Sequence, residues 1–226
     1  MKRSMLSLLV VLGVSSTSTA AVGQELGVVR LNPPDTARGH PFMTAVAIRA
    51  SATAWSDRNL SLQDLSDLLW AANGLNRPDE NKTTASSAMN AHDVDIYVFR
   101  QEGVFVYDYR NHELDPVRSG DFRSAILMRR PPRPGATPED PSRIEAPIQI
   151  VLVSDASRFR SGTDELKYEW GAIDTGIMSQ NISLFCAATG LKTRPRASVD
   201  KDKIKAILEL NETQHVFLNH PVGYAR

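Results

Sequence analysis

The strongest constraint on the fold is one long amphipathic stretch in the C-terminal half of the chain, residues 164–188. Its large apolar side chains recur at spacings of three and four, the period of an α-helix. These side chains are Trp170, Ile173, Ile177, Met178, Ile182 and Phe185. Gly190 follows, and a glycine just beyond the last turn is typical of a helix end. The sequence therefore predicts one helix that is longer than any other in the chain.

Three shorter helices are predicted from signals at their ends. Pro41 suits the first turn of a helix that runs through residue 49, because the missing N–H is not needed there. Ser61 is a predicted N-cap, with Asp64 three residues on, and Gly74 suits the position after the last turn. The helix between them presents one apolar face, formed by Leu62, Leu65, Leu68, Leu69 and Ala72. Asp200 is expected to cap a last helix that ends at Leu208.

Alternating apolar and polar residues predict strands between these helices. Residues 94–99 and 104–109 alternate with period two around the turn Glu102-Gly103, which indicates a β-hairpin. Asp93 and Asp95, at the start of this hairpin, have the spacing of solvent-exposed side chains. Residues 148–153 are apolar throughout, as in a buried central strand, and a final strand is expected over 215–218.

The remaining segments are predicted to be irregular or short. Residues 24–40 form an extended lead, 120–130 a short helix, and the proline-rich stretch 131–147 a loop. Strands and helices are interleaved without repeating as βαβ units, which indicates an α+β fold. The chain has 226 residues, 42% of them hydrophobic, enough for one domain with a sizeable core.

The first 23 residues have the features of a secretory signal peptide. Lys2 and Arg3 precede ten apolar residues, 5–14, and small residues follow. Cleavage is expected after Ala20 or after Gly23, and residues 24–226 are expected to form a domain exported to a periplasm. The apolar stretch is too short to anchor the chain in a membrane. The alternative is an N-terminal buried helix.

Several classes of function find no support. The formal net charge is zero and no basic patch is large enough to argue for nucleic acid. The five histidines lack metal-binding spacing, so no metal is expected. The single cysteine, Cys186, excludes an intramolecular disulfide and lies in an apolar run typical of a buried thiol. There is no Walker loop, no G-x-G-x-x-G and no G-x-S-x-G motif.

Two polar segments are candidates for a binding site instead. Arg49 and Ser51 lie two residues apart, and a guanidinium with a hydroxyl can grip a phosphate. The Ser/Asn-rich turn 86–90 can face the polar edge of a ring with donors and acceptors.

These segments belong to four blocks that, in their order, resemble the nitroreductase family of FMN flavoproteins, most closely its short exported bacterial members. The first is similar to the family's Arg-x-Ser-x-Arg phosphate motif and the third to its Pro-Ser-Ser-x-Asn-x-Gln turn. The blocks are Ile48–Trp55, Leu65–Arg77, Ser86–His92, and Asp174–Leu184 continuing into Thr189–Leu191 and Pro221–Tyr224.

The resemblance implies a central, mostly antiparallel sheet flanked by helices, in an intertwined homodimer built around helix 164–188. It implies that FMN is bound at its phosphate by the first block and at its ring by the third block of the other subunit. The loop 194–197 would place a backbone N–H near flavin N5. The implied FMN-binding residues are Arg49, Ala50, Ser51, Thr53, Ser87, Ala88, Met89, Asn90, Arg196 and Arg226.

Three positions depart from the family pattern. Thr53 stands where a second basic residue is usual, Ser86 replaces the usual proline, and His92 stands where glutamine is common. Arg226, just after Gly223-Tyr224, is a candidate for the missing phosphate charge.

The function implied is that of an oxidoreductase working by ping-pong electron or hydride transfer through flavin N5, between a small-molecule donor and a small organic acceptor. No catalytic side chain is required for hydride transfer, because the cofactor performs that chemistry. One alternative is an exported flavin- or ligand-binding protein with the same fold and no turnover. Another is a dimeric structural protein with an empty pocket.

Overall fold

The structure is a computed structural model that describes residues 26–128 and 145–226. The predicted signal peptide with its cleavage site, and most of the predicted loop 131–147, lie outside the described residues. No helix of the described ranges is long and apolar enough to cross a membrane.

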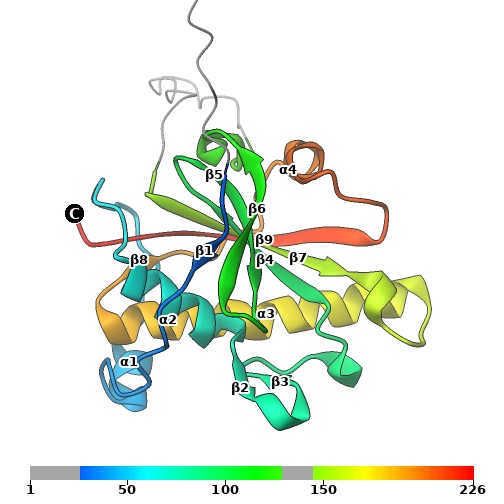
Figure 1. Cartoon of the computed structure of the whole chain (residues 1–226), viewed down its shortest axis with the longest axis horizontal. Coiled ribbons are helices and arrows are strands. Elements are labelled where there is room, and N and C mark those ends of the chain that lie inside the picture. Colours follow the sequence, from blue (N-terminus) through cyan, green and yellow to red (C-terminus); the bar gives the residue numbers. More distant parts are fainter. Residues whose placement is uncertain (1–25, 129–144) are drawn as a thin grey trace, which may run out of the picture.

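A seven-stranded antiparallel sheet forms the centre of the domain (Figure 1). Each neighbouring pair of strands is antiparallel, and two short strands, β2 (Leu75–Arg77) and β3 (Lys82–Thr83), form a separate hairpin. Across the sheet the order is β1 (Val29–Arg30), β6 (Glu113–Ser119), β5 (Gly103–Asp108), β4 (Val94–Phe99), β7 (Ile148–Asp155), β9 (Gln214–Gly223) and β8 (Lys192–Thr193). The α+β class and the mostly antiparallel sheet are therefore confirmed.

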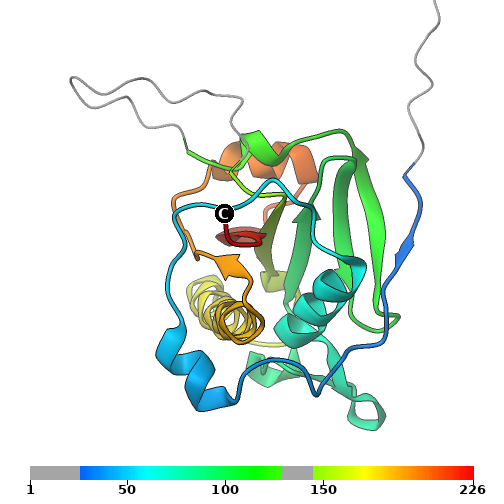
Figure 2. The ribbon, with the colours of Figure 1, turned by 90° about the vertical axis from the view of Figure 1, so that its left-hand side faces the viewer.

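The described residues contain four α-helices; three lie against this sheet and the first packs against the long third one, which Figure 2 shows end-on. They are α1 (Phe42–Ile48), α2 (Leu62–Asn73), α3 (Asp164–Thr189) and α4 (Lys201–Leu208). Helices α2 and α3 cover one face of the sheet and enclose the larger core, which includes Leu68, Ile150 and Ile182. Helix α4 covers the opposite face, where Ile204 and Leu208 pack. The sheet is thus buried on both sides.

The predicted helix ends are largely confirmed. Ser61 accepts a hydrogen bond from the Asp64 N–H, and Asp200 accepts one from the Lys203 N–H. Gly190 ends α3 in the left-handed conformation, with φ 80°. Pro41 precedes α1 as its N-cap instead of lying in its first turn. The predicted short helix 120–130 is wrong in extent, because its described part holds only a 3-10 turn, Arg123–Ala125.

Gly74 ends α2 as predicted, but not with the left-handed backbone that usually favours glycine there. The residue follows α2 directly, but its φ of −76° and ψ of 156° are extended values that any residue adopts. The requirement for glycine is one of space, because a Cβ at this position would lie 2.3 Å from Cδ1 of Trp70 and 2.7 Å from its Cα. The indole therefore folds over the end of its own helix.

We expect Gly74→Ala to lower the free energy of unfolding by about 1–3 kcal/mol, because the methyl group must displace the Trp70 ring and part of the helix backbone. Urea unfolding measures this change. Gly27→Ala is the control, since a Cβ there meets nothing within 4 Å. Equal stabilities of the two variants would contradict this reading of Gly74.

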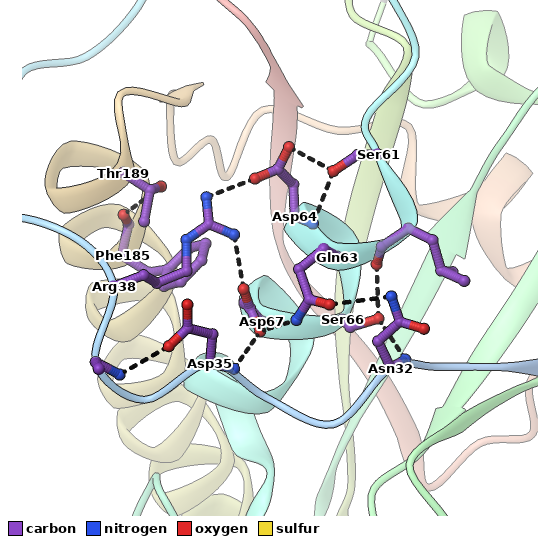
Figure 3. A network of polar contacts seen from close by, with 12 residues as sticks. Asn32, Asp35, Arg38, Ser61, Gln63, Asp64, Ser66, Asp67, Phe185 and Thr189 are labelled. Atoms are coloured by element: carbon purple, nitrogen blue, oxygen red, sulfur yellow. Dashed lines mark hydrogen bonds and ion pairs between the residues drawn. The ribbon is translucent and has the colours of Figure 1, made fainter.

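A polar network ties the extended lead to α2 and to the C-terminal end of α3 (Figure 3). The Arg38 guanidinium donates to Asp64 and to Asp67, both at 2.6 Å, and lies over the Phe185 ring. The Asp35 N–H donates to Asp67 at 2.8 Å. This network fixes the path of the chain into α1 and therefore into the first predicted binding segment.

Candidate functional site

The segment after α1 runs beside β8 and the end of β9. The Ala52 N–H donates to the Thr193 carbonyl at 2.9 Å, and the indole N–H of buried Trp55 donates to the Lys192 carbonyl at 2.9 Å. The Ser56 N–H donates to the Tyr224 carbonyl at 3.1 Å. Residues 49–56 are thus held as an ordered loop along one edge of the sheet.

This loop presents four of the predicted site residues to solvent: Arg49, Ala50, Ser51 and Thr53. The backbone of Arg49 ends α1, where its N–H donates to the Ala45 carbonyl at 3.0 Å. Within residues 26–128 and 145–226 its guanidinium has no hydrogen-bond or ion-pair partner. An unpaired guanidinium beside an exposed hydroxyl fits an anionic group such as a phosphate.

Arg196 and Arg226 differ in availability. Arg196 forms an isolated β-bridge with Asn219, and its guanidinium donates to Glu145 at 2.6 Å and to the Asn219 side chain at 3.2 Å. Its backbone N–H is also occupied, by the Asn219 carbonyl. Arg226 is exposed, two residues beyond Tyr224. The Arg58 guanidinium, which the sequence reasoning did not single out, lies 3.6 Å from the centre of the Tyr224 ring.

A buried histidine links β9 to α3 and β8 beneath the loop 49–56. His220 of β9 is fully buried, and its two ring nitrogens lie 2.8 Å from the Ser179 hydroxyl of α3 and 3.1 Å from the Thr193 hydroxyl of β8. Burial, with a smaller contribution from Arg196, lowers the pKa of His220 to about 3. The ring is therefore neutral in the folded protein and joins three elements at the edge of the sheet.

Because the unfolded chain takes up a proton at this histidine near pH 6.5 and the folded protein does not, stability falls as the pH drops from about 6.5 toward 3. We expect His220→Gln, which cannot titrate, to show a shallower loss over this window in urea unfolding. His40→Gln, at an exposed histidine, serves as the control. Identical pH slopes for wild type and His220→Gln would contradict the buried neutral ring.

The second predicted segment, Ser87–Asn90, is a strained turn. Met89 and Asn90 have φ values of 55° and 53°, and His92 has 48°, all in the left-handed region. Each such residue costs on the order of 1 kcal/mol, and strain of this kind concentrates at functional sites. The Ser87 hydroxyl accepts from the His92 N–H at 3.0 Å, while the Asn90 side chain is exposed and has no partner among the described residues.

Two carboxyl groups lie directly beneath this turn. Asp174 of α3 accepts the Ala88 N–H at 2.7 Å and is 4% exposed. Asp93 is fully buried, which overturns its predicted exposure, because the strand start faces α3 and not solvent. The sequence reasoning missed Asp174, although its spacing of four and eight residues from Met178 and Ile182 places it on the buried face of the helix.

Within one chain, the two predicted parts of the site, residues 49–53 and residues 87–90, lie far apart. The turn is anchored at Asp174, whereas the lead into α1 is anchored near the end of α3, where the His40 N–H donates to the Ala188 carbonyl at 2.9 Å. These anchor points are separated by about 21 Å along the helix axis at 1.5 Å per residue. Figure 1 shows α1 and β8 at one end of α3, away from β2 and β3. Within a single chain, therefore, the two segments do not meet.

The described residues give little support for a metal site or a reactive thiol. The described ranges contain no group of three or more histidine, cysteine, aspartate or glutamate side chains that could hold a metal ion. Cys186 is buried as predicted, and burial raises the pKa of its thiol. The candidate site therefore consists of hydrogen-bonding groups and cations, which suit binding of an anionic ligand.

Comparison with known proteins places this arrangement in a family. The model of the Nitroreductase family matches residues 46–224. A candidate nitroreductase from Ralstonia eutropha JMP134 shares 30% sequence identity, with 91% of this chain and 93% of that chain covered, and superposes with a TM-score of 0.78. No relative was found among the curated proteins.

More distant structures share the fold. One is a chain of the Escherichia coli microcin synthetase complex McbBCD, at 18% identity, 78% and 69% coverage of this chain and that chain, and a TM-score of 0.64. Another is a candidate nitroreductase from Anabaena variabilis ATCC 29413, at 17% identity, 82% and 38% coverage, and a TM-score of 0.63. The chain belongs to the nitroreductase family, whose members are generally oxidoreductases.

Proposed function

We propose that the protein is an FMN-dependent oxidoreductase that passes electrons or hydride from a small-molecule donor to a small organic acceptor in a ping-pong cycle. The observation that carries the proposal is the exposed guanidinium of Arg49, which has no partner among the described residues, together with the strained Ser/Asn turn in the same chain. Both lie in the part of the chain that matches the family.

The loop would hold the phosphate. Arg49 offers paired N–H donors and Ser51 a hydroxyl, while Ala50 and Thr53 lie exposed in the same segment. Arg226 and Arg58 add positive charge near the end of β9. Arg196, already paired with Glu145, would shape the neighbouring wall and leave the phosphate to the other cations.

The turn would hold the polar edge of the ring. The Ser87 hydroxyl already accepts the His92 N–H and keeps its own proton for donation. Asn90 provides both a donor and an acceptor. Left-handed φ at Met89 and Asn90 sets the direction in which these groups point.

Two chains would complete each site. The loop and the turn lie at separated places along α3, so one ring system is best held by the loop of one chain and the turn of its partner. Exposed apolar side chains provide an interface for this homodimer: Leu166, Ile173 and Ile177 share one face of α3, with 42%, 53% and 36% of their surface exposed. Phe42 and Met43 of α1 are exposed as well.

When bound, FMN supplies the hydride chemistry at its N5. The residues of this chain bind and orient it: Arg49 neutralises negative charge, and the turn fixes the ring. No proton donor is required of the protein for hydride transfer, which agrees with a site made of binding groups. We further propose that the mature protein is exported, as residues 1–23 indicate, so its donor must be one that is present outside the cytoplasm.

The test is anaerobic mixing of the FMN-loaded protein with NADH, NADPH and a reduced quinone in turn, followed by a nitroaromatic or quinone acceptor. The proposal predicts that one donor bleaches the visible absorbance of bound flavin and that the acceptor restores it. Bound flavin that only dithionite bleaches would overturn the enzyme and support the exported flavin-binding protein without turnover.

A further inference from the structure

The carboxyl groups of Asp93 and Asp174 lie beneath the strained turn, and one oxygen of Asp93 has no hydrogen-bond partner among the described residues. Asp93 directly precedes β4 and Asp174 lies in α3, and both carboxyl groups are buried and line the same small recess. Oδ2 of Asp93 accepts the Ser154 hydroxyl at 2.5 Å, but its Oδ1 is buried without any donor among the described residues. Two buried carboxyl groups that line one recess repel each other when both are ionised, so one of them is expected to hold a proton.

We propose that Asp93 is protonated and donates to Asp174, and that this pair is the positioning device that holds the Ser87–Asn90 turn in its strained, ring-facing conformation. Asp174 then accepts two hydrogen bonds, one from Asp93 and one from the Ala88 N–H. The inference rests on the proposed function for what the turn faces, but not for the proton itself.

Burial supports this assignment. The pKa of Asp93 is raised to about 7, mainly by burial; the Ser154 hydroxyl opposes this shift and the neighbouring Asp174 contributes to it. Burial also raises the pKa of Asp174, but the hydrogen bonds from Ala88 and Asp93 favour its charged form. The proton therefore resides on Asp93, and Asp174 is the acceptor.

The charged groups around the pair are few and already engaged. Arg158 donates to Asp95 at 2.6 Å and lies 3.7 Å from Asp155, so its charge is shared with two other carboxylates. Burial lowers the pKa of His92, whose Nε2 lies 2.9 Å from the Asn81 carbonyl. Among the described residues none of these groups forms an ion pair with Asp93, so losing its proton would leave two like charges at one recess.

The pair also borders a small recess. Asp93 and Asp174 line a cavity of about 10 Å³ together with Ser87, His92 and Asn73. Repulsion between two carboxylates would be relieved by movement of the Asp174 side chain into or away from this space. Because Asp174 holds the Ala88 N–H, the turn would move with it. The proton on Asp93 therefore couples pH to the direction of the Ser87 and Asn90 side chains.

Asp93→Asn tests the idea, because an amide donates to Asp174 and accepts from Ser154 but cannot lose a proton in this range. We expect the FMN affinity of wild type to fall about tenfold more than that of Asp93→Asn as the pH rises from about 7 to about 9. Asp174→Ala, which removes the anchor, should bind FMN weakly at every pH. Asp202→Asn, an exposed aspartate of α4, is the matched control and should follow wild type.

Urea unfolding without flavin keeps this test separate from the proposed function. A raised pKa means that the unfolded chain loses the proton first, so wild type should lose stability between pH 4 and pH 7 relative to Asp93→Asn. If no variant binds FMN but the unfolding curves diverge in this way, the proposed function fails and the protonated pair stands. If Asp93→Asn follows wild type in both measurements, the pair is overturned.

Discussion

Replacing Arg49 with alanine is expected to weaken FMN binding by about 10- to 100-fold, because a charged hydrogen-bonding group contributes roughly 1.5–3 kcal/mol. The Arg49 side chain is exposed and unpaired within the described ranges, so its removal leaves the fold intact. Equilibrium titration of the apoprotein, followed by flavin fluorescence quenching, measures the change.

Two further variants serve as comparisons for the affinity of Arg49→Ala. Arg49→Lys keeps the charge but loses the paired donors, so it should fall between wild type and Arg49→Ala. Arg30→Ala removes an exposed arginine from β1, at the opposite edge of the sheet from β8, and should bind as wild type does. Equal affinities for Arg49→Ala and Arg30→Ala would contradict the phosphate site.

Ile177→Glu is expected to dissociate the proposed homodimer and to abolish FMN retention at the same time. Ile177 shares an exposed apolar face of α3 with Ile173 and Leu166, and a charge buried in an interface there costs several kcal/mol. Because the loop and the turn of one chain lie apart, a monomer offers each flavin only half of its contacts. Size-exclusion chromatography with light scattering, read beside flavin absorbance, tests both losses together.

Val117→Glu is the control for this change. Val117 is an exposed apolar residue of β6, with 39% of its surface accessible, and lies on the sheet away from α3. It should stay dimeric and keep its flavin. A wild-type monomer that binds FMN fully, or an Ile177→Glu variant that stays dimeric with flavin, would contradict the shared site.

Much of the fold could be predicted because its elements carry strong local signals. The long apolar period of α3, the hairpin of β4 and β5, and the Ser61 and Asp200 caps all decide structure within a few residues. The final strand was underestimated, since β9 continues through Pro221 to Gly223. Proline is tolerated there because the short edge strand β8 pairs only with Val222 and Gly223.

Strands whose position depends on neighbours could not be predicted. β6 contains Pro116 and three charged residues, and only Leu114 is fully buried, so it has no clear alternation. Its place is set by pairing with β5 across a bulge between Val104 and Phe105. β1 and β8 are two residues long and carry no sequence pattern of their own.

The residues of the candidate site, like the strands, divide into those that the sequence could predict and those that it could not. Exposed residues such as Arg49 and Asn90 could be named from their chemistry and order along the chain. Asp93 could not, because aspartate is rarely buried and the recess around it is completed by Asp174, which lies 81 residues away in sequence and comes near only after folding. The hydrogen bonds of His220 could not be predicted either, because their partners, Ser179 and Thr193, come from two other elements.

The most direct test of the central claim is the visible spectrum of the purified mature protein after incubation with FMN and desalting. The account predicts bound flavin at one molecule per chain, because a two-fold symmetric dimer has two equivalent sites, and predicts that the same preparation of Arg49→Ala loses it. A wild-type protein that remains colourless at every FMN concentration would contradict the account.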